Sequence, residues 1–271
     1  MKFDSNRAWQ QASAMISANR EVVLAMAGVF FLLPQLVIAL MFPEPAIGDS
    51  MTQEQMLEAM RVYYVSMLPV SLPLALFQSV GTISVLILLG DSTRPTVGEA
   101  IRRSLKAVVP YILGALLLGL AFGLVAALAA GLGAATGGTA LAVILIAAVL
   151  FGAVYVGIRC SLSAATIALD GILNPVAALK RSWDLTRGNA ARILGFYALI
   201  LIGAVVISSV AGIVIGLPLS LAFGAETGRI VQMVIAALVG AVISLYLVAI
   251  IAAVHRQLAG PDPRDEASTF E

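Results

Sequence analysis

Six long apolar runs, none with a charged residue in its central portion, constrain this chain more than any other feature of its sequence. A bilayer core about 30 Å thick requires about 20 consecutive apolar residues in a helix that rises about 1.5 Å per residue. Each run reaches that length, so we predict an all-α, polytopic membrane protein that forms one integral membrane domain over residues 1–271. The predicted spans cover approximately residues 22–42, 66–90, 108–131, 140–160, 193–217 and 230–254, and a short polar cytoplasmic tail follows at 259–271.

The composition excludes several soluble classes of protein. Hydrophobic residues make up 61% of the 271 residues, and charged residues only 11%. Soluble domains carry about 25% charged residues, so the bulk of this chain is neither a water-soluble enzyme, a nucleic-acid-binding protein nor a disordered protein. The first run is longer than a signal-peptide core of about 7–15 residues, and we expect it to be retained. The single cysteine, Cys160, excludes an intrachain disulfide.

Lysine and arginine residues are distributed unequally between the connections of the six runs. Of the 16 in the chain, only Arg61 and Arg229 fall on one side, whereas all the others fall on the side of the N-terminus. Cytoplasmic connections of membrane proteins carry an excess of these residues. We therefore predict that the N-terminus and the C-terminus both lie in the cytoplasm.

A short amphipathic segment precedes each odd-numbered run. The clearest covers residues 174–188, with an N-cap at Asn174 and a C-terminal left-handed position at Gly188. Residues 96–106 begin with a capping box, and residues 6–20 form a fainter copy. We predict three repeated units, each an interfacial amphipathic helix followed by a hairpin of two membrane helices. The alternative is that basic segments resemble one another because the positive-inside rule requires them.

These segments carry basic residues that we expect to contact anionic lipid headgroups. Trp9 and Trp183 are predicted interfacial anchors. Arg159, at the cytoplasmic end of the fourth run, is expected to extend its head to the surface, with a contact to a lipid phosphate or a partner as the alternative. The candidate headgroup ligands are Arg102, Arg103, Lys106, Arg159, Lys180, Arg181 and Arg187.

Small residues recur every four positions on the third, fifth and sixth runs. Lipid provides no hydrophobic drive for helix association, so close backbone approach at small residues has to hold the helices together. The predicted packing positions include Gly119, Gly123, Ser208, Gly212, Gly216 and Gly240.

Prolines in the first two runs predict kinks, and amide side chains within the runs predict interhelical hydrogen bonds. The prolines are Pro34, Pro69 and Pro73, and the amides are Gln35, Gln78 and Gln232.

The sequence offers little catalytic chemistry. A metal site needs clustered His, Cys or carboxylate ligands, but the chain has one histidine, His255, at the end of the last run. No Gly-x-Ser-x-Gly elbow and no phosphate-binding Gly-x-x-x-x-Gly-Lys run is present. We therefore predict no catalytic residue, no metal and no cofactor, and we assign no role to His255 or Cys160.

Two segments resemble a bacterial family. They read Arg-Cys-Ser-Leu-Ser-Ala-Ala-Thr-Ile-Ala-Leu-Asp-Gly at 159–171 and Ala-Leu-Lys-Arg-Ser-Trp-Asp-Leu-Thr-Arg-Gly-Asn at 178–189. Both are similar to the recurrent segment of the glycerophosphoryl diester phosphodiesterase membrane-domain family, which is related to the YciC-like six-helix inner-membrane proteins. Residues 3–20 resemble the N-terminal segment of that family. The resemblance implies a membrane module in the bacterial inner membrane, with catalysis carried by a separate soluble domain in some members.

These observations lead to two expectations for function. The first is a non-enzymatic inner-membrane protein with an accessory role in envelope or lipid homeostasis, in contact with anionic lipids and with a possible membrane-protein partner. The alternative is a small transporter or permease subunit with a substrate path between helical hairpins. An intramembrane lipid-modifying enzyme is disfavoured because clustered acid and base groups are missing.

Overall fold

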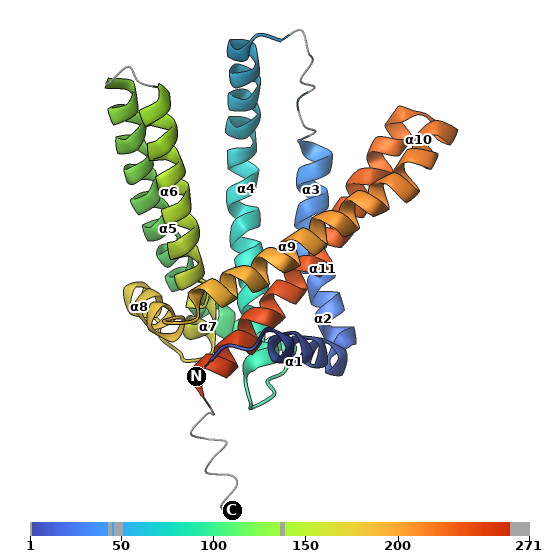
Figure 1. The fold of residues 1–271 in the computed structure, drawn as a ribbon. Helices are drawn as coiled ribbons and strands as arrows, with labels where there is room; N and C mark the ends of the chain where they lie inside the picture. The colour runs from blue at the N-terminus through green and yellow to red at the C-terminus, as the bar shows by residue number, and fades with distance from the viewer. Residues whose placement is uncertain (1, 43–44, 46–50, 136–138, 261–271) are drawn as a thin grey trace, which may run out of the picture.

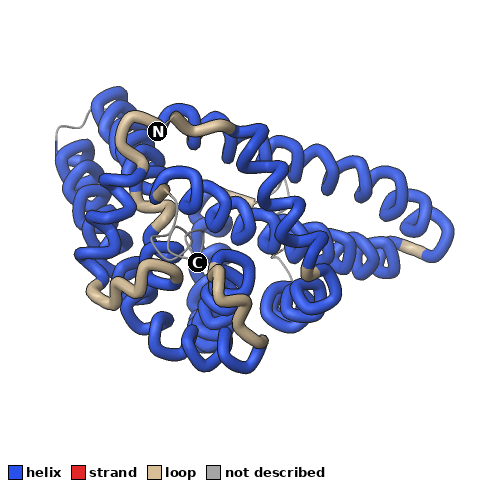
Figure 2. Tube along the Cα trace, turned by 90° about the horizontal axis from the view of Figure 1, so that it is seen from below, coloured by secondary structure: helices blue, strands red, loops and turns tan. Residues whose placement is uncertain are grey.

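The chain folds into helices, and the part that the structure describes contains no strand (Figures 1 and 2). The structure is a computed structural model that describes residues 2–42, 45, 51–135 and 139–260. Within these residues six helical segments are long and apolar enough to cross a membrane, which confirms the predicted fold class. The elements are α1 (Ser5–Ala18), α2 (Arg20–Ala27), η1 (Gly28–Leu32), α3 (Leu33–Met41), α4 (Gln53–Gly90), α5 (Val97–Ala135), α6 (Thr139–Arg159), α7 (Ser163–Ala168), α8 (Pro175–Leu185), α9 (Ala190–Ala211), η2 (Gly212–Gly216), α10 (Leu217–Phe223) and α11 (Ala225–Ala259).

The second spanning helix is longer than the sequence predicts. Helix α4 begins at Gln53 rather than near residue 66, because Thr52 and Gln55 form a capping box that starts the helix early. Its 38 residues extend about 57 Å, well beyond the thickness of a bilayer core. The helix continues through Pro69 and Pro73 without ending.

One predicted interfacial helix does not exist as a separate element. Residues 96–106 form the start of α5, which runs without interruption from Val97 to Ala135. Its Thr96–Glu99 capping box is present as predicted. By contrast, α8 is a separate helix, and Gly188 after it has the left-handed φ of +79° that was predicted. Residues 107–109 offer no glycine of that kind, so the second amphipathic segment fuses with its membrane helix.

Two spanning segments contain a π-helical turn just before a proline. Segments η1 and η2 are each followed by a leucine and a proline, Pro34 in one case and Pro218 in the other. Leu33 donates its N–H to the carbonyl of Gly28, five residues earlier, and Leu217 donates to Gly212 in the same way. Proline has no N–H, and its ring collides with the carbonyl four residues earlier, so the preceding turn widens. The disturbance predicted at Pro34 is therefore a π-turn.

Three pairs of spanning segments diverge from one end of the molecule, which we call the base (Figure 1). The base contains α1, α7, α8 and both ends of the described chain. Helix α11 is the central element, since it contacts α1, α4, α7, α8, α9 and the segments from α2 to α3. The main core clusters around it and includes Leu86, Leu162, Ile193, Leu245 and Ile250.

The spanning helices are exposed along much of their length. No residue is buried in the most apolar part of α6 or of the α9–α10 segment, and few are buried in that of α5. Soluble proteins rarely expose apolar surfaces of this size to water, whereas a membrane-spanning helix exposes them to lipid. The packing that fixes the fold is therefore concentrated at the base.

Candidate functional site

A turn between α6 and α7 holds helix α8 against the base. Helix α6 ends at Arg159, whose carbonyl accepts a hydrogen bond of 2.9 Å from the Ser182 hydroxyl. The same hydroxyl accepts the backbone N–H of Leu162 at 3.0 Å, and the Thr186 hydroxyl lies 3.1 Å from the Arg159 carbonyl. Ser182 and Thr186 are fully buried, so these contacts satisfy backbone groups that the end of α6 leaves unpaired.

Arg159 does not extend to the surface. Its side chain is only 5% exposed, and its guanidinium carbon lies 4.3 Å from the centre of the Trp183 ring. This is a cation–π contact, and Tyr155 packs edge-on against the same ring at 5.9 Å. Burial beneath protein atoms contradicts the expectation that Arg159 reaches the aqueous surface, and it argues against Arg159 as a headgroup ligand.

Asp170 brings together two basic side chains that are distant in sequence. His255 at the end of α11 places Nε2 3.0 Å from Oδ1 of Asp170, and Arg181 of α8 places Nε 3.6 Å from Oδ2. The imidazole is buried, and although Nε2 lies at ion-pair distance it is not aligned as a hydrogen bond to the carboxylate. His255 had no predicted role. No local motif could have revealed this contact, because it depends on how α11 packs against α7.

A similar corner lies where α4 meets α5. Arg103 donates to Asp91 at 2.6 Å, and the buried hydroxyls of Ser84 and Ser104 are hydrogen-bonded at 2.9 Å. Partial burial acts to raise the pKa of the Asp91 carboxyl. Hydrogen bonds from the backbone and hydroxyl of Thr93 and from Arg103 outweigh burial and hold that pKa below its ordinary value.

The two corners share a pattern. In each, an aspartate after one helix pairs with an arginine on the next amphipathic segment, Arg103 or Arg181. The residue after that arginine is a buried serine that is hydrogen-bonded to a residue 20 positions earlier. Ser104 is bonded to Ser84, and Ser182 to Leu162. Ala100 and Ala178, four residues before these serines, are both fully buried in one small core.

Four of the remaining predicted headgroup ligands are exposed and outside ion-pair distance of a carboxylate, and the charge of Arg102 acts on Glu99 from farther away. Within the described residues, Arg102, Lys106, Lys180 and Arg187 have no carboxylate at ion-pair distance, unlike Arg103 and Arg181. At the opposite end of the molecule the arginines are paired locally. These pairs are Arg61 with Glu58 at 2.8 Å and Arg229 with Glu226 at 2.7 Å.

The two predicted anchors differ in exposure. Trp9 on α1 is 46% exposed and stacks on Tyr246 of α11, with ring centres 5.3 Å apart. Trp183 is half-buried over Arg159. Both positions leave part of the ring accessible, and the anchoring role of each stays a prediction.

The close approaches between helices are not where the small-residue pattern places most of them. A methyl group added at Gly119 or Gly123 would meet nothing within 4 Å, so these positions hold no other helix of this chain together. Gly212 and Gly216 are in ordinary contact range of Gln232, and Ser208 is half-buried. Gly240 is a tight position, since a methyl group there would overlap Oε1 of Gln35.

A close approach at Gly81 in the first hairpin was not predicted. A methyl group at Gly81 of α4 would overlap the Cβ and ring of Phe30 in η1. Gly81 is not part of a repeated small-residue pattern in the expected register, so no periodic signal marked it.

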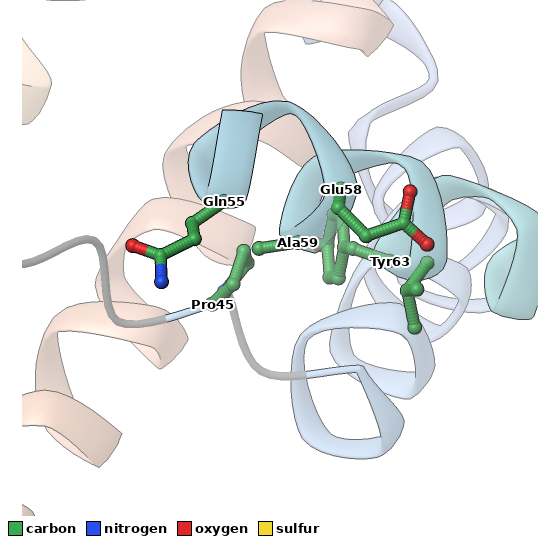
Figure 3. Close-up of a pocket in the computed structure, with 6 residues that line it drawn as sticks. Pro45, Gln55, Glu58, Ala59 and Tyr63 are labelled. Atoms are coloured by element: carbon green, nitrogen blue, oxygen red, sulfur yellow. The ribbon is translucent and has the colours of Figure 1, made fainter. Parts of the chain in front are cut away.

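Cavities occur along the spanning segments that the structure describes. The first, of about 500 Å³, lies beside the beginning of α4, far from the base, and is lined by apolar surface with Gln55 and Glu58 at its edge (Figure 3). The second, of about 400 Å³, lies between α3, α4 and α11 and is lined in part by Gln35, Gln78, Thr82 and Ser244.

Searches of protein-family models, of curated proteins and of solved structures found no match to this chain. Among the described residues, no three His, Cys, Asp or Glu side chains lie together as potential metal ligands. The fold and the apolar spans therefore define the class, a six-helix membrane protein, and its activity has to be argued from its surfaces.

Proposed function

We propose that this chain is a non-enzymatic, multi-pass membrane protein whose base lies at the cytoplasmic membrane surface and contacts anionic lipid headgroups. The observation that carries the proposal is the difference between the two ends of the molecule. Exposed cations without a carboxylate at ion-pair distance gather on α5, on α8 and just after α8 at the base, whereas Arg61 and Arg229 at the other end are each paired with a neighbouring glutamate. A net positive surface of this kind attracts anionic lipid and favours the cytoplasmic side.

The faces of α8 support an interfacial position. Small residues, Ala178 and Ser182, face the protein, while the large apolar Val176 is 61% exposed and Lys180, four residues later, is exposed on the same side. A helix that packs small residues against the protein and exposes apolar and basic side chains on its other side is suited to lie along a membrane surface.

Replacement of the four unpaired cations tests this proposal. We expect the variant Arg102→Gln, Lys106→Gln, Lys180→Gln and Arg187→Gln to retain less phosphatidylglycerol on purification, because each cation near an anionic surface contributes about 1 kcal/mol. Bound lipid is measured by mass spectrometry after extraction from mixed phosphatidylglycerol–phosphatidylcholine nanodiscs. The matched control is Arg61→Gln with Arg229→Gln, which should retain lipid as the wild type does. Equal retention by the fourfold variant and this control would contradict the proposal.

The finer assignments rest on the sequence. A bacterial inner membrane and an accessory role in envelope or lipid homeostasis follow only from the resemblance of residues 159–171, 178–189 and 3–20. The proposed repetition of units is supported by the matching corners at Arg103 and Arg181 and is weakened by the fusion of the second amphipathic segment into α5.

A further inference from the structure

Uncharged polar side chains from three spanning helices line one cavity within the predicted spans. Gln35 comes from α3, Gln78 and Thr82 from α4, and Ser244 from α11, while Phe31 of the π-turn η1 also lines it. The volume of about 400 Å³ is enough for roughly a dozen water molecules or an organic group of comparable size. Polar groups inside a membrane are costly and commonly mark a functional site.

The polar groups of this cavity have unused hydrogen-bonding capacity. The amides of Gln35 and Gln78 and the hydroxyl of Thr82 make no hydrogen bond within the described part of the chain. Ser244 donates to the Gly240 carbonyl at 2.8 Å, which leaves its oxygen free to accept. The cavity therefore presents both donors and acceptors, and an occupant that satisfies them must offer both.

Gly240 and the π-turn position Gln35 toward this cavity. Because a methyl group at residue 240 would overlap Oε1 of Gln35, the glycine provides the space in which that amide lies. The π-turn ends at Leu32, three residues before Gln35. It adds a residue to the helical turn and so rotates the side chains that follow it. π-turns are frequent at functional sites, and this one lies directly beside the cavity.

The lining also limits the charge of an occupant. No charged side chain is among the residues that line the cavity. An ion would lose its hydration there without gaining an opposite charge, at a high free-energy cost. An entirely apolar occupant would leave the amides unpaired.

We propose that this cavity binds an uncharged, hydroxyl-bearing group. Two sources share that chemistry: the head of a neutral lipid such as a diacylglycerol, and a small soluble polyol. This inference is independent of the headgroup contacts at the base.

The test uses the double variant Gln78→Leu with Thr82→Val, which removes polar atoms and nearly preserves volume. Ser79→Ala is the matched control, because Ser79 lies between these residues in sequence and its hydroxyl bonds only to its own helix, at the Ala75 carbonyl. In the lipid arm, a photoreactive diacylglycerol is cross-linked to the full chain in liposomes, with competition by dioleoylglycerol or by phosphatidic acid with the same acyl chains. In the polyol arm, proteoliposome swelling is followed in erythritol.

We expect the wild type and Ser79→Ala to give a signal in one arm, and the double variant to lose it about fivefold or more, as for at least one net hydrogen bond. A diacylglycerol signal identifies a lipid occupant, and an erythritol signal identifies a soluble one. Should the double variant fail to fold, Thr82→Val and Gln78→Met are tested singly with the same expectation of loss. The proposal is overturned if neither arm separates wild type from these variants, or if phosphatidic acid competes as well as dioleoylglycerol.

Discussion

Asp170 connects three elements of the base through two side chains. The carboxylate follows α7, His255 reaches it from the end of α11, and Arg181 reaches it from α8. A half-buried carboxylate is stabilised by such partners and is left poorly solvated when one is removed. Through its two partners, Asp170 therefore links α11 to α8.

We predict that His255→Ala lowers stability by about 2 kcal/mol or more. The substitution removes a buried ring and one partner of Asp170, so it creates a cavity and weakens a polar contact. The measurement is the thermal melting temperature of the purified protein in detergent. Arg256→Ala is the control, since Arg256 is the adjacent residue and is exposed. If His255→Ala and Arg256→Ala have the same melting temperature, the contact between His255 and Asp170 does not stabilise the base.

At the scale of elements, two kinds of glycine occur on the spanning helices. Gly81 lies against Phe30, where α4 meets the first spanning segment, whereas Gly123 on α5 faces open space. Only the first kind brings two backbones of this chain together. The spacing of small residues along one helix does not reveal whether another helix lies opposite, and for that reason the predicted pattern included Gly119 and Gly123.

We predict opposite outcomes for two identical substitutions. Gly81→Ala should cost about 1–3 kcal/mol, because the new methyl group overlaps the Cβ of Phe30 and the backbone has to move. Gly123→Ala should be neutral or slightly stabilising, since it adds a better helix former in open space. Thermal melting in detergent compares the two variants. Equal destabilisation by both would show that Gly123 also packs against something, such as a second molecule.

Local signals predicted the helix ends better than they predicted the contacts. The caps at Asn174, Thr96 and Gly188 were identified because a cap depends on residues within one turn. The early start of α4 at Thr52 was missed because charged residues there suggested a loop. The amides and hydroxyls that line the cavity come from α3, α4 and α11, so their meeting depends on tertiary packing that no single segment encodes.

At the scale of the whole molecule, the base is both the packed and the charged end. The core surrounds α11 there, while the spanning helices beyond it diverge and expose apolar surface (Figure 1). The number and length of the apolar runs predicted six spans, but nothing in their composition predicted this divergence. With six spans, both ends of the described chain lie on one side, and the unpaired cations at the base favour the cytoplasm.

Site-directed cysteine labelling in intact spheroplasts tests six spans with a cytoplasmic base most directly. The variants are Glu54→Cys and Glu226→Cys, at exposed positions away from the base, and Ser92→Cys and Lys180→Cys, at exposed positions of the base. The native Cys160 is buried, so the wild type serves as the unlabelled control. A membrane-impermeant maleimide should label positions 54 and 226 in intact spheroplasts, and positions 92 and 180 only after permeabilisation. Labelling of position 92 or 180 in intact spheroplasts would contradict the account.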